Sequence, residues 1–244
     1  MMRALNFSKR NFKELIRDPL STIFALILPL FLLFIFQTIK IPSEQFNIEN
    51  FTPGIIVFGS SFLTLFTSML VSKDRASSLL IRLGVSPMKT TDYIFGYVLS
   101  FIPVIIIQNI LFFILACFFG LQFSYSMILT VLTSIIIGML YIVIGLLLGS
   151  CFNDKTAPPL SSIIIQLVCF TSGMYFPKEM VGDIFAKICG YLPFESCVTI
   201  IKGIMNNTIE IISLKNIVVF VVYTIVILVL SIIVFKKKMI SDNN

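Results

Sequence analysis

The chain has 244 residues, of which 57% are hydrophobic and 12% are charged, and its mean hydropathy is +1.02. Soluble domains are typically about 45–50% apolar and about 25% charged, so this composition excludes an ordinary soluble domain and a disordered chain. There is no histidine, which excludes histidine-based catalysis and histidine metal ligands. We therefore predict an all-α integral membrane protein without a metal site. Its net charge of +6 indicates membrane anchoring rather than nucleic-acid binding.

The apolar residues form six stretches that are each long enough to span a bilayer, for which about 20 residues are needed. The third and fourth stretches share the segment from Tyr93 to Asn153, whose 61 residues include no charged residue. A turn at Gly120–Ser126 divides that segment into two spans. The predicted spans are 20–39, 53–71, 93–119, 127–152, 159–176 and 217–235, in one transmembrane domain over residues 1–244.

Lysine and arginine are distributed unevenly between the two sides that this topology defines. Thirteen of them flank the spans on the side of the amino terminus, and five lie on the other side. Since cytoplasmic flanks of membrane proteins are enriched in basic residues, both termini are predicted to be cytoplasmic. The expected location is the plasma membrane of a prokaryotic cell, which the chain crosses several times.

The amino-terminal segment is amphipathic. Leu5, Phe12 and Ile16 recur at helical spacing among basic residues, and Asp18-Pro19 ends the pattern before the first span. Such a helix is expected to lie in the membrane interface, in contact with lipids. It is either a positively charged anchor or a lateral brace that moves with the first span.

The loop over residues 73–92 also has helical character. Leu79, Leu80 and Leu83 share one helical face, and Arg75 and Arg82 lie elsewhere on the helix. A short helix of this kind can fit into a cleft of a soluble partner. The loop is therefore either an ordinary cytoplasmic connection or a docking segment.

The outer segment 177–216 contains two apolar helical patterns, which are interrupted near Pro193. A broken helix at membrane depth is tolerated only against protein or a wet cavity, so we predict an external re-entrant or interfacial hairpin before the last span. Cys189 and Cys197 could pair there if the segment is oxidised, although the number and spacing of the cysteines favour free thiols.

The predicted spans contain amides but no charged residue. The amides are either hydrogen-bonding links between helices or ligands for a substrate. An ion-coupled transporter normally has an acidic residue near the midplane, which is missing, and no GxxxxGK[ST] phosphate loop is present. Energy for active transport would therefore come from another polypeptide. Gly145 and Gly149 form a GxxxG pattern, which allows two helices to approach closely.

Several segments together resemble the membrane subunits of ATP-binding-cassette exporters of the type-2 (ABC-2) class. They are the basic helix ending in Arg17-Asp18-Pro19, the loop from Lys73-Asp74-Arg75 to Ser86-Pro87, the step Ser172-Gly173-Met174-Tyr175-Phe176-Pro177, and Leu192-Pro193-Phe194. The resemblance implies a half-transporter with six spans, which pairs with a second copy or a paralogue. It also implies a separate ABC ATPase subunit that binds ATP and magnesium, so this chain would hold no cofactor and catalyse no covalent chemistry.

The resemblance also implies roles for particular residues. Those expected to receive the ATPase are Asp74, Arg75, Leu79, Leu80, Arg82 and Leu83. Those expected to shape an outer gate are Gly173, Phe176, Pro177, Pro193 and Phe194. Candidate residues of a substrate cavity are Phe62, Phe66, Gln108, Asn109 and Gln166.

The predicted function is export of a drug-like, amphiphilic or antibiotic-peptide substrate, which corresponds to multidrug or antibiotic resistance. The alternative is a membrane immunity or scaffold protein that transports nothing and needs no ATPase. An intramembrane enzyme is disfavoured, because neither histidine nor a buried acid is available to activate a serine or cysteine.

Overall fold

The computed structural model describes residues 2–17, 19–39, 41–77, 90–175 and 182–241. In these ranges the chain is helical and contains no strand. The helices are α1 (Met2–Arg17), α2 (Pro19–Ile39), η1 (Glu44–Phe46), α3 (Ile48–Ala76), α5 (Thr90–Phe118), α6 (Ser126–Cys151), α7 (Ala157–Thr171), α8 (Asp183–Tyr191), α9 (Pro193–Met205), η3 (Ile209–Ile211) and α10 (Leu214–Ser241). The all-α fold class is therefore confirmed.

Four helices are long and apolar enough to cross a membrane, namely α3, α5, α6 and α10. They coincide with four of the six predicted spans. The first and fifth predicted spans coincide with shorter apolar helices, Leu26–Ile39 within α2 and Ala157–Thr171. The described residues thus give four spans, or five if α8 and α9 together count as one, and six spans stay a prediction.

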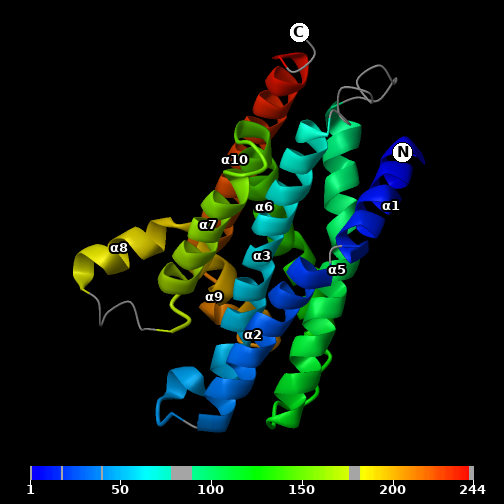
Figure 1. Ribbon diagram of the computed structural model, residues 1–244. Coiled ribbons are helices and arrows are strands. Elements are labelled where there is room, and N and C mark those ends of the chain that lie inside the picture. The colour runs from blue at the N-terminus through cyan, green and yellow to red at the C-terminus, as the bar shows by residue number, and fades with distance from the viewer. Residues whose placement is uncertain (1, 18, 40, 78–89, 176–181, 242–244) are drawn as a thin grey trace.

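Helices α8 and α9 form the broken pair that was expected in the outer segment. Their axes are bent by 75° at Leu192, and Pro193 begins α9. Proline is suited to the first turn of a helix, because its missing N–H would have no partner within the helix. Figure 1 shows α8 projecting sideways from the bundle, whereas α9 lies against it.

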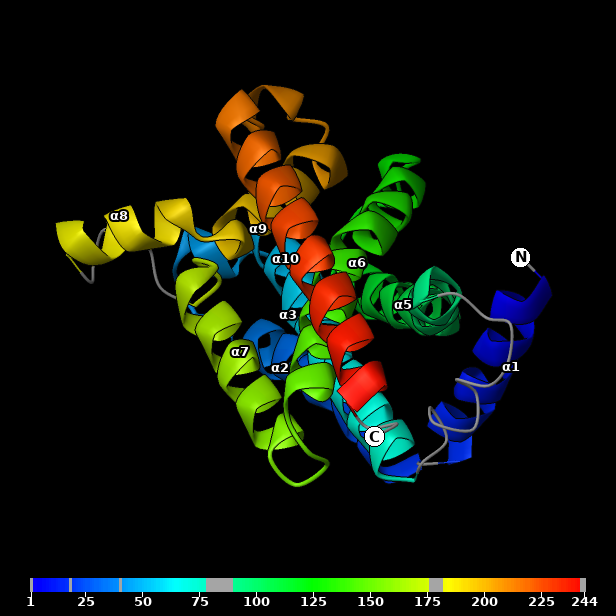
Figure 2. The same cartoon turned by 90° about the horizontal axis from the view of Figure 1, so that it is seen from above.

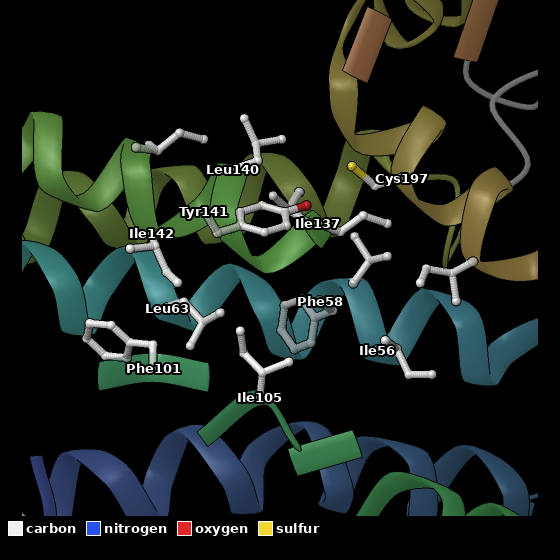
Figure 3. Packing of buried hydrophobic residues seen from close by; sticks show 14 of the residues in the cluster. Ile56, Phe58, Leu63, Phe101, Ile105, Ile137, Leu140, Tyr141, Ile142 and Cys197 are labelled. Atoms are coloured by element: carbon white, nitrogen blue, oxygen red, sulfur yellow. The ribbon is translucent and has the colours of Figure 1, made fainter. Parts of the chain in front are cut away.

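Helix α3 lies inside the bundle, where it packs against α2, α5, α6, α7 and α9, whereas α10 packs on α6, α9 and α5 (Figure 1). In its most apolar window 83% of the residues are buried, against 11% for α10. Figure 3 shows the core that results, where Leu63 of α3 lies among Phe101 and Ile105 of α5 and Ile142 of α6. In Figure 1 the two ends of the chain lie toward the same end of the bundle. The side of the membrane that this end faces stays a prediction.

Helices α3 and α6 pack against each other closely, and small residues make this possible. A Cβ atom on Gly149 would lie 2.7 Å from the carbonyl oxygen of Ser68, and one on Gly145 would overlap the carbonyl oxygen of Thr64. The Thr64 hydroxyl donates across the same contact to the Tyr141 carbonyl, at 3.0 Å. The GxxxG pattern therefore lies at an internal helix contact, where the two backbones approach each other.

Candidate functional site

The strongest cluster of charged residues lies where α3 ends, at the start of the 73–92 loop. Asp74 is in the last turn of α3 and its side chain is fully buried. Its Oδ2 accepts hydrogen bonds from Nη1 of Arg10 and from the hydroxyl of Tyr97, both at 2.8 Å. Nη2 of Arg10 lies 2.7 Å from Oδ1, as an ion pair rather than an aligned hydrogen bond. One carboxylate thus links α3 to α1 and to α5.

Two further charges extend this cluster to the surface. Glu14, one turn after Arg10 on α1, pairs with the same guanidinium group, and Nζ of Lys73 lies 3.2 Å from its other oxygen. Burial disfavours the charged form of Arg10, but the hydrogen bond and charge of Asp74 outweigh this effect and raise the pKa of Arg10 above its ordinary value. The arginine therefore stays charged at any physiological pH.

Aromatic packing holds α1 in the position that this ion pair requires. The ring of Phe7 packs edge-on against Tyr93 and Tyr97 of α5, with centroids 5.5 Å and 5.1 Å apart. Gly96 lies under the same ring, and a Cβ atom there would meet Phe7. The amphipathic helix is therefore docked on the bundle along one face, mainly on α5. Whether it acts as an anchor or as a lateral brace stays a prediction.

Arg75, the next residue of α3, reaches a different helix. Its Nη1 donates to the carbonyl oxygens of Gly149, Ser150 and Phe152, at 3.2, 2.6 and 3.3 Å. These carbonyls belong to the last turn of α6 and the residue after it, where no intrahelical partner remains for them. A cation at this position also interacts favourably with the negative end of the helix dipole.

Replacing Arg75 with alanine is expected to loosen the carboxyl end of α6. A partly buried cation at a helix carboxyl terminus contributes up to about 2 kcal/mol, so the local opening free energy should fall by about 1–2 kcal/mol. This opening free energy is measured by hydrogen exchange of the backbone amides of residues 149–153 in the purified full chain. Lys155→Ala, in the exposed connection that follows, is the control and should change nothing. Equal protection in the two variants would contradict the capping role.

Asp74 and Arg75, which we call the junction, therefore both have partners within the chain. The resemblance implied that both residues receive an ATPase, and this role stays a prediction. In the structure Asp74 is buried against α1 and α5, and Arg75 is bound to α6. The reason is that α3 continues to Ala76, so both residues belong to a packed helix rather than to a loop. Leu79, Leu80, Arg82 and Leu83 lie outside the described residues.

The residues of the expected outer gate are only partly described. Gly173 has a φ of +73°, which favours glycine, and its carbonyl oxygen accepts a hydrogen bond of 2.7 Å from Nε2 of Gln45. Pro193 and Phe194 are buried at the start of α9, where the Phe194 ring stacks on Tyr141 of α6. Phe176 and Pro177 lie outside the described residues, and the gate stays a prediction.

The candidate cavity residues do not form one wall within the chain. Phe66 and Gln108 are in the core, and Nε2 of Gln108 lies close to Gly59 of α3. Nδ2 of Asn109 donates to the carbonyl oxygen of Ile105 in its own helix, at 2.8 Å. Phe62 is half-buried, whereas Gln166 is exposed on α7. Gln166 is therefore not part of the core that holds Phe66 and Gln108.

One feature of the ion-pair cluster was not expected from the sequence. Arg10 and Tyr97 were not predicted as site residues, although they are the partners of Asp74. Cys189 and Cys197, both within the described ranges, are buried and carry free thiols in this structure, and their pairing in an oxidised chain stays untested.

Comparison with known proteins agrees with this architecture. No curated protein matches the chain. The family model described as ABC-2 type transporter matches residues 5–206, from the amphipathic helix α1 to the end of α9. Since this match covers most of the sequence, the chain belongs to the ABC-2 type transporter family, as the resemblance predicted.

Proposed function

We propose that the chain is the permease subunit of an ATP-driven exporter whose energy comes from a separate ABC ATPase subunit. The membrane domain of this family is a transport component and not itself a catalyst. The observation that supports the proposal most directly is the junction, which lies at the end of α3 where the 73–92 loop begins. Force applied to this loop would act first on Asp74 and Arg75, which are bound to three other helices.

In the proposed mechanism the ATPase pushes on the loop through Leu79, Leu80, Arg82 and Leu83. The junction passes the displacement to α1 and α5 through Asp74, and to α6 through Arg75. These contacts are short and mostly buried, so the helices would shift together rather than slide past one another. The amphipathic helix thereby becomes a moving part of the permease rather than a passive anchor.

The remaining parts of the proposal concern assembly and substrate. A second copy or a paralogue would complete the pathway, with Phe62, Phe66, Gln108 and Asn109 as candidate contacts and the α8–α9 pair near the outer gate. ATP and magnesium would bind the partner ATPase. The 25 phenylalanines favour a drug-like, amphiphilic or antibiotic-peptide substrate. Both termini would be cytoplasmic in a prokaryotic plasma membrane.

Purification of the tagged chain from its native membrane in mild detergent tests the proposal. A nucleotide-binding subunit should copurify with the wild type and be lost in Leu79→Asp, because a carboxylate on the apolar face of the loop would have to be desolvated at the contact. Lys155→Asp introduces the same side chain in the α6–α7 connection and should retain the subunit. Absence of any ATPase from the wild-type complex would instead favour an immunity or scaffold protein.

A further inference from the structure

Helix α1 has three distinct faces. At 3.6 residues per turn, one face carries the buried residues Ala4, Phe7, Asn11 and Leu15, which pack on the bundle. A second face carries Leu5 and Ile16, whose side chains are 42% and 59% exposed although they are apolar. Figure 2 shows α1 at the outer edge of the bundle, and among the described helices it packs mainly on α5.

The third face is basic and lines a groove. The groove has a volume of about 680 Å³ and opens between α1 and the end of α3. Lys9, Lys13 and Arg17 line it from α1, and Lys73 lines it from α3. Arg10 and Glu14 lie between these residues, as part of the ion-pair cluster around Asp74. We call this feature the basic groove.

The charges of the basic groove are not balanced. Among the described residues that line it, the one carboxylate is Glu14, which already pairs with Arg10 and Lys73. For Lys9, Lys13 and Arg17, no carboxylate of the described residues lies within ion-pair distance. All three side chains are exposed. The groove therefore has an excess of positive charge that an anion can neutralise.

We propose that the basic groove binds the headgroup of an anionic phospholipid. The ligand must be both anionic and apolar, because the strip of Leu5 and Ile16 runs along α1 beside the basic residues. A phospholipid matches this arrangement, with its phosphate in the groove and its acyl chains along the strip. An acidic protein surface would satisfy the charges but leave the apolar strip uncovered. The proposal does not depend on transport or on an ATPase.

Binding of fluorescent phosphatidylglycerol to the purified full chain in neutral detergent tests the proposal. Each basic side chain near an anionic lipid surface contributes roughly fivefold in affinity, so Lys9→Gln/Lys13→Gln/Arg17→Gln should weaken binding roughly 100-fold. The charge-conserving variant Lys9→Arg/Lys13→Arg/Arg17→Lys should keep the wild-type affinity. It also shows whether altered folding, rather than charge, causes the loss.

Lys236→Gln/Lys237→Gln/Lys238→Gln is the matched control, since it removes three cations from the end of α10 without touching the groove. It should bind like the wild type, and a large excess of inorganic phosphate should not displace the lipid. Equal losses in the two glutamine variants would overturn the proposal in favour of general surface charge. Displacement by phosphate would overturn it in favour of a simple anion site. Unchanged lipid binding, with loss of a copurifying protein, would identify a protein interface instead.

Discussion

Replacing Gly145 with alanine is expected to destabilise the helical bundle by about 1–3 kcal/mol, the usual cost of overpacking a close contact. The new methyl group would overlap the carbonyl oxygen of Thr64 and lie 2.8 Å from Cβ of Thr67. Both atoms are on or next to the backbone of the central helix α3, so neither can move as the end of a flexible side chain can. The gain of up to about 1 kcal/mol in helix propensity does not offset this overlap.

The measurement is the midpoint of thermal unfolding of the purified full chain, followed by the loss of the monodisperse peak in size-exclusion chromatography. Gly190→Ala in α8 is the matched control. A Cβ atom there has only the Lys215 ammonium nitrogen nearby, at an ordinary 3.6 Å. The control should equal or slightly exceed the wild type in stability, because alanine is the better helix former. A Gly145 variant as stable as this control would contradict the close α3–α6 contact.

The spans and the close helix contact were predictable because each has a local cause. Long uncharged stretches demand helices in a membrane, and the structure has α3, α5, α6 and α10 where four of these stretches were predicted. Glycines spaced four residues apart lie on one helical face, so Gly145 and Gly149 indicated a contact before its partner helix was known. Pro193 likewise marked the break between α8 and α9.

The junction was not predictable in the same way, because its partners are distant in the sequence. Asp74 and Arg10 are 64 residues apart, and Arg75 meets carbonyl oxygens 74–77 residues away. The sequence showed a charged pair before a leucine-rich loop, which suggested an exposed contact. Only the folded chain shows that α1 lies against α5 and neutralises Asp74. The sequence did contain one indication of this surface, because Tyr93 and Tyr97 are one helical turn apart on α5. Both rings pack against Phe7 of α1.

Replacing Asp74 with asparagine is expected to lower the free energy needed to detach α1 from the bundle. The change preserves the shape of the side chain but leaves Arg10 without its buried counter-charge and aims an amide donor at the guanidinium group. Loss of a charged partner in a buried hydrogen-bond network costs about 1–3 kcal/mol. The cost for Asp74→Asn should stay within this range, because water can solvate the Arg10 side chain, which is 36% exposed. Hydrogen exchange of the α1 amides in the full chain should accelerate by about tenfold or more.

A double-mutant cycle separates this ion pair from the aromatic packing around it. Arg10→Gln should accelerate exchange in α1 to a similar extent, and Arg10→Gln/Asp74→Asn should add little to either single change, because both remove one shared interaction. Lys73→Gln removes only the exposed outer pair with Glu14, whose lysine side chain is 67% exposed, and should change the opening free energy by less than about 1 kcal/mol. If the effects of the Arg10 and Asp74 changes were additive, the two residues would not act as a pair. A different result would be that neither change accelerates exchange in α1. Phe7 and its tyrosine partners alone would then hold α1, and the brace would not depend on charge.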